Sequence, residues 1–367
     1  MRIRNKKTFL LGGLMLLTAG IIGCESVGYY SQAIQGQYSL LQKRQPISEI
    51  IADPDSPEFL RDRLSFILGV RQFAKNDLQL PVKRHYLTYV DLKRPYAVWN
   101  VFAAPEFSLT PKTWCYPVVG CAAYRGYFSE EIARQYADEL VNQGYEVYVA
   151  GVTAYSTLGW FDDPVLSTFV QYSKVQAAAL IFHELAHQVL YVKGDTVFNE
   201  SFATAVEQEG LRRWQLASKN SQVYANYLKS YRRQQQFVRL IMHYRNMLES
   251  LYQTDTSPTD KRGKKASIFS ELRDEFEHLK TSEADLSVYD EWMNQSLNNA
   301  KIGSVVAYHD LVPTFQKLLE ESDNDLNRFY KRCHQLAQKP RDERQRILKT
   351  YLARGNQLKK SVIEGHP

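Results

Sequence analysis

The sequence lacks the features that would place most of this chain inside a membrane. After the first 23 residues, no run of about 18 apolar residues occurs, so no later segment is long enough to span a bilayer as a helix. Only 18 glycines and 4 cysteines occur among the 367 residues, and 44% of the residues are hydrophobic. This composition is globular rather than disordered, and the length suits one large domain or two modest ones.

A strong excess of charge of one sign is also missing. The formal net charge is +6, but four of the 46 basic side chains, Arg2, Arg4, Lys6 and Lys7, lie in the first seven residues. Without the first 23 residues, 42 basic and 40 acidic side chains remain, which is a net charge of +2. A nearly neutral protein has little attraction for phosphate backbones, so the sequence argues against a nucleic-acid partner.

The beginning of the chain has the pattern of an export signal. The basic segment Met1–Lys7 precedes an apolar stretch of about 15 residues, fewer than the ~20 that a spanning helix requires. Residues Ile21–Cys24 resemble the lipobox of bacterial lipoproteins. The resemblance implies cleavage before Cys24, acylation of Cys24 and, with Glu25 next, a lipid anchor in the outer membrane facing the periplasm. An ordinary signal peptide, cut at another bond, is the alternative.

The few cysteines do not form a metal-binding pattern. If Cys24 is acylated, three cysteines remain in an oxidising compartment. Cys115 and Cys121, with five residues between them, could close a small loop, and Cys333 would then be a free, buried thiol. None of these residues pairs with a histidine at zinc-finger spacing.

Hydrophobic periodicity predicts a small sheet among helices in the first half of the chain. Aromatic and β-branched residues indicate strands at Tyr96–Phe102 and Tyr145–Ala150, on either side of an ordered loop or hairpin at Trp114–Phe128. Apolar residues at helical spacing predict helices at Tyr29–Lys43, at Glu58–Lys75 and from Ser129 to Gly144.

Helical spacing dominates from Leu166 onwards. One helix is expected at Phe169–Val192, closed by Gly194, and one long helix or two consecutive helices at Asn199–Leu251. Thr254–Lys265 predicts a polar break with a solvated run of basic residues. Helices resume at Ile268–Leu279 and Leu311–Leu319. The predicted fold class is therefore α+β, mostly helical, with a small antiparallel sheet before the motif helix.

The segment Leu180–Gln188 carries the decisive motif. His183 and His187 are four residues apart in a helical pattern, so their side chains lie one turn apart on the same face and can reach one zinc ion. Glu184 could hold and deprotonate the attacking water, as in the H-E-x-x-H motif. Apolar neighbours place both imidazoles near a core, where a metal would supply a partner. The alternative is a helix with two polar-facing histidines that bind nothing.

A catalytic zinc ion needs a third protein ligand and an open position. Gly194 and the residues after it predict a turn between two helices, and Glu200 follows thirteen residues after His187. A second, antiparallel helix could thus present Glu200 to the metal from its first turn. A glutamate at the beginning of a helix can instead be only a favourable partner of the helix dipole. We predict that Glu200 is the third ligand.

Residues Asn199–Ala203 resemble the N-E-G-F-A element that carries the glutamate ligand of the gluzincin aminopeptidases. Together with the signal and with Tyr155–Pro164, they resemble the putative aminopeptidase family of bacterial envelope proteins. The resemblance implies a zincin-like domain, one zinc ion per chain and peptide substrates. There are two departures from the gluzincins. Only 12 residues separate His187 from Glu200, and the G-x-M-E-N element that grips a free amino terminus is missing.

Residues near the motif are candidates for contact with a substrate. The predicted strand Tyr145–Ala150 sits where gluzincins pair an edge strand with the substrate backbone. Asp162 and Asp163 could fix a substrate amine or cap the helix that follows Pro164.

Further candidates lie downstream of the motif. Glu207 is seven residues after Glu200, on the same helix face, and could support the ligands or form a surface salt bridge. Gluzincins stabilise the oxyanion with a downstream tyrosine or histidine. Tyr308 is the preferred candidate here because it lies shortly before Pro313, and the alternatives are His243 and Tyr244.

These assignments give four regions: a signal peptide at 1–23, an N-terminal helical region at 24–95, a zincin-like catalytic core at 96–255 and a C-terminal helical region at 256–367. We expect a zinc-dependent peptide hydrolase of the cell envelope, an aminopeptidase by resemblance. The alternative is a non-enzymatic envelope lipoprotein with a structural zinc site or a docking role. The intact Glu184 argues against it, since a structural site gains nothing from a general base.

Overall fold

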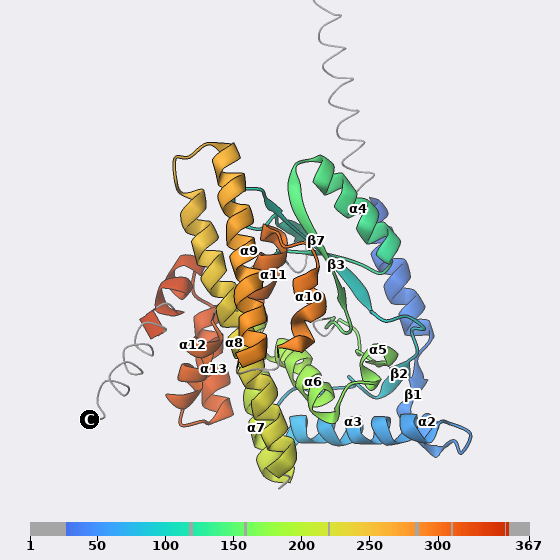
Figure 1. Ribbon diagram of the computed structural model, residues 1–367. Helices are drawn as coiled ribbons and strands as arrows, with labels where there is room; N and C mark the ends of the chain where they lie inside the picture. The colour runs from blue at the N-terminus through green and yellow to red at the C-terminus, as the bar shows by residue number, and fades with distance from the viewer. Residues whose placement is uncertain are drawn as a thin grey trace, which may run out of the picture.

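The computed structural model describes residues 27–116, 120–157, 160–218, 221–282, 286–309, 311–348 and 350–351 (Figure 1). The side chains of 218–224, 282–285 and 306–310 are outside this description, so Tyr308 is placed only by its backbone. Cys24 and the predicted signal also lie outside the described residues. Helices predominate in the described part and the sheets are small, so the predicted α+β class is confirmed.

One three-stranded sheet has the order β6-β3-β7 and contains both predicted strands. The central strand β3, Val98–Pro105, pairs antiparallel with β7, Tyr145–Val152, along its whole length, and with β6, Arg125–Tyr127. Helix α4, Glu130–Asn142, packs on this sheet. Its beginning is capped by the hydroxyl of Ser129, as the sequence predicts.

The predicted hairpin between these strands is confirmed. Strand β4, Trp114–Tyr116, pairs with β5, Gly120–Ala122, and a disulfide joins Cys115 to Cys121 directly across the pair. Cys333 is a buried free thiol, as expected. A second three-stranded sheet, in which β2 and β8 are parallel, consists of β1, Gln45–Pro46, β2, Thr88–Val90, and β8, Val165–Leu166.

The helices form the body of the molecule. The N-terminal side has helix 27–42, α2, Ile47–Ala52, and α3, Glu58–Asn76. The remaining long helices are α6, Lys174–Val189, α7, Thr196–Ser218, α8, Ser221–Tyr252, and α9, Pro258–Ser282. They are followed by α10, Asp290–Asn294, α11, Asn299–His309, α12, Val312–Glu320, α13, Leu326–Ala337, and helix 341–348.

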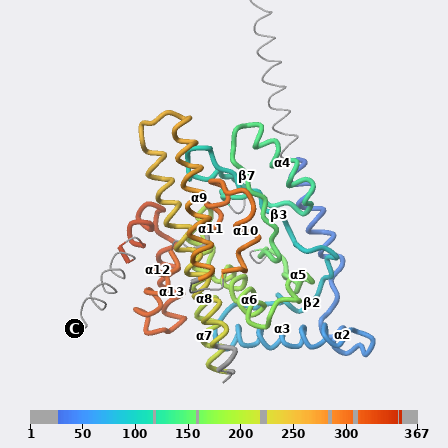
Figure 2. Tube along the Cα trace, viewed as in Figure 1, coloured from blue at the N-terminus to red at the C-terminus, as the bar shows by residue number. Residues whose placement is uncertain are grey.

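Two hydrophobic cores hold these helices together. The larger one draws on residues from Leu40 to Leu348 and packs α3, α6, α7, α12 and α13 together. The smaller one lies largely between α8 and α9, which run side by side in Figure 2. Helix 27–42 and helices α12 and α13 lie on opposite sides of the molecule (Figure 1). The motif helix α6 is thus packed against α7 in the interior.

The predicted single helix Phe169–Val192 is wrong. The structure has α5, Ser167–Val170, and then a break before α6 begins at Lys174. Ser173 and Gln176 form a capping box, in which the Ser173 hydroxyl accepts a bond from the backbone N–H of Gln176 and the Gln176 side chain accepts one from that of Ser173. This reciprocal cap starts a new helix in the middle of an apolar pattern.

The expected polar break at Thr254–Lys265 is also wrong for most of its length. Ser257 caps α9, and Pro258 occupies its first position, where a missing N–H costs nothing. The basic run therefore lies inside a helix. Lys265 is buried rather than solvated, and its ammonium group contacts Glu146 on β7 at 2.5 Å. The region Asn199–Leu251 consists of two helices, α7 and α8.

No helix in the described part of the chain combines the length and apolar character that membrane spanning requires. The division into four regions at residues 23, 95 and 255 stays a prediction.

Candidate metal centre

Helix α6 holds both motif histidines against the interior. Ala178, Ile181 and Leu185 are almost fully buried, which fixes the rotation of the helix about its axis. The rings of His183 and His187 consequently face the same side, with their centroids 5.0 Å apart. His187 is 7% exposed and His183 is half-buried. The structure thus brings the two predicted ligands close enough together to bind one ion.

The turn between α6 and α7 brings Glu200 to the histidines. Gly194 adopts a φ of +77°, a conformation that glycine accepts at no steric cost, and Asp195 caps α7 by accepting a hydrogen bond from the N–H of Phe198 at 3.2 Å. The side-chain amide of Asn199 bonds both the N–H and the carbonyl of Val192, at 2.7 and 2.9 Å. Glu200 follows in the second turn of α7, one turn later than predicted.

The three predicted ligands converge. Oε2 of Glu200 lies 3.2 Å from Nε2 of His183 and 3.6 Å from Nε2 of His187, and the potential ligand atoms all lie within 4.8 Å of one another. Two ligand atoms at ~2.0–2.1 Å from a tetrahedral ion are separated by about 3.3–3.4 Å. Two histidines and one glutamate are also a donor set that catalytic zinc sites use. The group fits a metal ion and is compatible with zinc.

Glu207 orients one of the imidazoles. Its Oε2 lies 3.1 Å from Nδ1 of His183, so the carboxylate bonds the ring nitrogen that does not face Glu200. This is the supporting role that carboxylates take behind metal-binding histidines, rather than a surface salt bridge. Nδ1 of His187 is buried and has no such partner in the described part of the chain.

The electrostatics of the group favour a positive charge at its centre. Burial opposes protonation of His183, but its bonds to Glu200 and Glu207 outweigh burial and raise its pKa well above the usual value. Burial alone would raise the pKa of Glu200, but the two histidines hold that pKa well below its ordinary range. A proton on His183 therefore supplies part of the positive charge that these carboxylates favour, and a divalent cation would supply more.

Glu184 is beside this group but is not one of its potential ligands. It lines the same cavity, and burial raises the pKa of its carboxyl group, against the opposing effect of both histidines. A carboxylate with a raised pKa, close to the potential metal ligands, is better suited than an ordinary one to accept a proton from a nearby water molecule.

The group opens into a large cavity of about 860 Å³. Helix 27–42, strands β3 to β7 and helices α6 and α7 all contribute to its lining. Sequence reasoning missed two of its hydroxyl groups, those of Tyr124 and Tyr191. Tyr191 lies just beyond the end of α6, with its ring centroid 6.4 Å from that of His187, so helical spacing does not place it, and Tyr124 has no local signal either. Burial raises the pKa of both, and the nearby Glu200 carboxylate reinforces this.

Several predicted residues lie elsewhere. Tyr244 is buried in the smaller core and donates a hydrogen bond to Glu275 at 2.7 Å, and neither it nor His243 lines the cavity. Asp163 neither caps the following helix α5 nor lines the cavity. It is buried and accepts hydrogen bonds from Thr157, and its backbone N–H donates to Nδ1 of His85 at 3.0 Å. These contacts hold the loop before β8 instead.

The model of the putative aminopeptidase family matches residues 28–348. The chain belongs to this family. Membership indicates a peptidase function, and the match includes the whole of the metal-binding group. Neither the curated proteins nor the solved structures gave a match.

Proposed function

We propose that this protein is a zinc-dependent peptide hydrolase, with His183, His187 and Glu200 as ligands of one zinc ion per chain. The observation that carries the proposal is the convergence of these three side chains, with Glu184 beside them, in one large cavity. Membership of the putative aminopeptidase family supports peptides as the substrates.

Different residues of the chain would have different roles in the proposed peptide hydrolysis. A zinc ion would polarise the scissile carbonyl and lower the pKa of the attacking water. Glu184 would accept the proton of that water and deliver it to the leaving nitrogen. Tyr124 and Tyr191 line the same cavity near Glu200, and we assign the stabilisation of the oxyanion to them in place of His243 and Tyr244. The role of Tyr308 stays a prediction.

The substrate would lie along strand β7. This strand is at one edge of its sheet, and Val152 and the residues after it line the cavity. An extended peptide added to such an edge gains backbone hydrogen bonds. An aminopeptidase specificity follows from the family, and we propose that acylated Cys24 holds the protein in the outer membrane of a bacterial cell envelope, facing the periplasm.

A Glu184→Gln variant tests the catalytic role. Glutamine keeps the size of the side chain but cannot accept the proton, so zinc content and thermal stability should stay the same while peptide hydrolysis drops about 10²–10⁴-fold. The assay uses zinc-loaded full-length protein with free and amino-blocked peptides, and cleavage only of the free peptides would indicate an aminopeptidase. Equal turnover by the variant would assign the activity to another site or to a contaminant.

The alternative, a non-enzymatic lipoprotein with a structural zinc site, is less well supported. Structural zinc sites are filled by four protein ligands. The described residues provide one group of three, and it opens into the cavity. Failure of zinc-loaded wild-type protein to cleave any peptide would favour this alternative.

A further inference from the structure

The walls of the cavity differ in chemistry from the surface that carries the metal-binding group. Helices α6 and α7 supply the carboxylates of Glu184, Glu200 and Glu207, whereas the walls are mostly aromatic or small and apolar. Representative wall residues are Tyr29, Tyr30, Ala33, Tyr116, Phe128 and Tyr155. None of the described residues that line the cavity is a lysine or an arginine.

Helix 27–42 forms one wall and is firmly attached to the sheet at its first turn. The ring of Tyr29 packs against those of Tyr116 and Tyr127, each with a centroid distance of 5.6 Å. The guanidinium group of Arg125 lies 4.2 Å from the centre of the Tyr29 ring. Aromatic and cation–π contacts of this kind stabilise the packing by more than the burial of apolar area alone. This wall of the cavity is therefore preformed.

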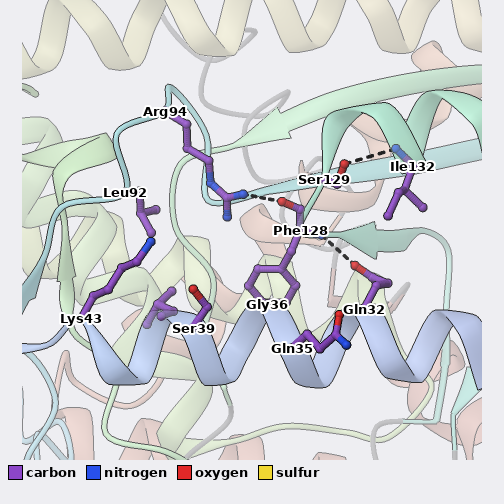
Figure 3. Close-up of a pocket in the computed structure, with 11 residues that line it drawn as sticks. Gln32, Gln35, Gly36, Ser39, Lys43, Leu92, Arg94, Phe128, Ser129 and Ile132 are labelled. Carbon is purple, nitrogen blue, oxygen red and sulfur yellow. Dashed lines mark hydrogen bonds between the residues drawn. The ribbon is translucent and has the colours of Figure 1, made fainter.

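A second attachment lies along the same helix (Figure 3). The ring of Phe128 points at Gly36, where a Cβ atom would lie 2.2 Å from its Cγ. The side chain of Gln32 accepts a hydrogen bond from the N–H of Phe128 at 3.1 Å, and Arg94 donates to the Phe128 carbonyl. Because Phe128 also lines the catalytic cavity, these bonds fix one of its walls.

We propose that this cavity selects peptides with a large apolar side chain on the residue whose carbonyl is attacked, and that it rejects acidic side chains there. The inference rests on the proposed peptidase function and names its substrate class. A large apolar side chain would be buried among aromatic rings, which is favourable in proportion to the area removed from water. An acidic side chain would meet three carboxylates and no basic residue among those described.

Ala33 makes helix 27–42 a specificity-determining element. Ala33 lines the cavity together with Tyr30, and its side chain is a single methyl group. The next residue, Ile34, is 68% exposed on the outer face of the same helix. The two neighbouring positions therefore provide a matched pair for substitution, one inside the cavity and one outside it.

The test compares peptides that differ only in their first residue, with phenylalanine, leucine, alanine or aspartate at that position. For zinc-loaded full-length protein, kcat/KM for phenylalanine and leucine should exceed that for alanine about tenfold or more, because hydrophobic pockets discriminate by this amount, and aspartate should be the poorest substrate. Ala33→Phe should lower the ratio of kcat/KM for the phenylalanine peptide to kcat/KM for the alanine peptide about tenfold. Ile34→Phe should leave this ratio unchanged.

A binding experiment separates this inference from the proposed function. The Glu184→Gln variant should bind the phenylalanine peptide more tightly than the aspartate peptide in calorimetry, and Ala33→Phe in that background should remove the difference. Selective binding without hydrolysis by the wild type would support the proposed side-chain preference and contradict the proposed peptidase function. Hydrolysis with equal kcat/KM for all four peptides, or an unchanged preference in Ala33→Phe, would contradict the proposed side-chain preference but not the peptidase function.

Discussion

Replacing Glu207 would test whether the proposed metal centre depends on residues behind its ligands. The Glu207 carboxylate bonds Nδ1 of His183 at 3.1 Å, and the two side chains are 24% and 14% exposed. In Glu207→Ala the ring of His183 loses the partner that fixes its orientation. Loss of such a partner typically lowers metal affinity 10–100-fold, which is about 1.4–2.7 kcal/mol. Glu207→Gln should lose less, because its amide oxygen can still accept the ring N–H.

The assay is a zinc competition titration against a chelator of known affinity, with circular dichroism to confirm that each variant is folded. Glu209→Gln is the matched control. Glu209 is a buried carboxylate on the same helix, but it pairs with Arg212 and Arg213, each at 2.7 Å. The control should lower the free energy of unfolding and leave the zinc dissociation constant of the folded protein nearly unchanged.

Two results would refute the reasoning. An unchanged zinc affinity in Glu207→Ala would mean that His183 needs no orienting carboxylate. Conversely, if Glu207→Ala lost its zinc while Glu200→Ala retained it fully, Glu207 would be the third ligand and the assignment would be wrong by two helical turns. The expected order is a near-complete loss in Glu200→Ala and a graded loss in Glu207→Ala.

Three further predictions concern other parts of the chain. Arg344→Met should lower the free energy of unfolding in urea by about 3–5 kcal/mol, because it leaves Asp195 buried without its partner, and an unchanged midpoint would contradict this. Replacing both Cys115 and Cys121 by serine should cost about 2 kcal/mol by the entropy of a short closed loop, measured in the same assay. Cys24→Ser should abolish fatty-acid labelling and release the protein from membranes; wild-type protein that never takes up the label would refute the lipid anchor.

The sequence predicts those parts of the site that depend on local geometry. His183 and His187 share a face because the α-helix repeats every 3.6 residues, whatever surrounds it. Glu207 falls on the face of Glu200 for the same reason. Tyr124 lies in the bend between β5 and β6, more than fifty residues before the motif, and the pairing of β6 with β3 brings that bend to the cavity. Local patterns carry no information about such a pairing.

The wrong predictions have a common physical origin. The run of basic residues before Lys265 is typical of a solvated loop, but Ser257 and Pro258 are equally typical of the beginning of a helix. Which interpretation holds depends on Glu146, a distant residue on β7 that compensates the buried ammonium group of Lys265. In the same way, the cavity lining does not include Tyr244, since its helix turns that side chain into the smaller core.

The position of Glu200 depends on a residue far along the chain. The cap that starts α7 is Asp195, and its second oxygen is held by Arg344 at 2.6 Å, with both side chains about 5% exposed. Movement of the last described helix would therefore alter the beginning of α7 and, one turn later, the third ligand. At the other end of the described residues, helix 27–42 lines the same cavity. Because the family match runs from residue 28 to residue 348, it includes both elements, and a shorter chain would lose one of them. The beginning of α7 thus depends on a residue of a distant helix, which the H-E-x-x-H motif alone does not specify.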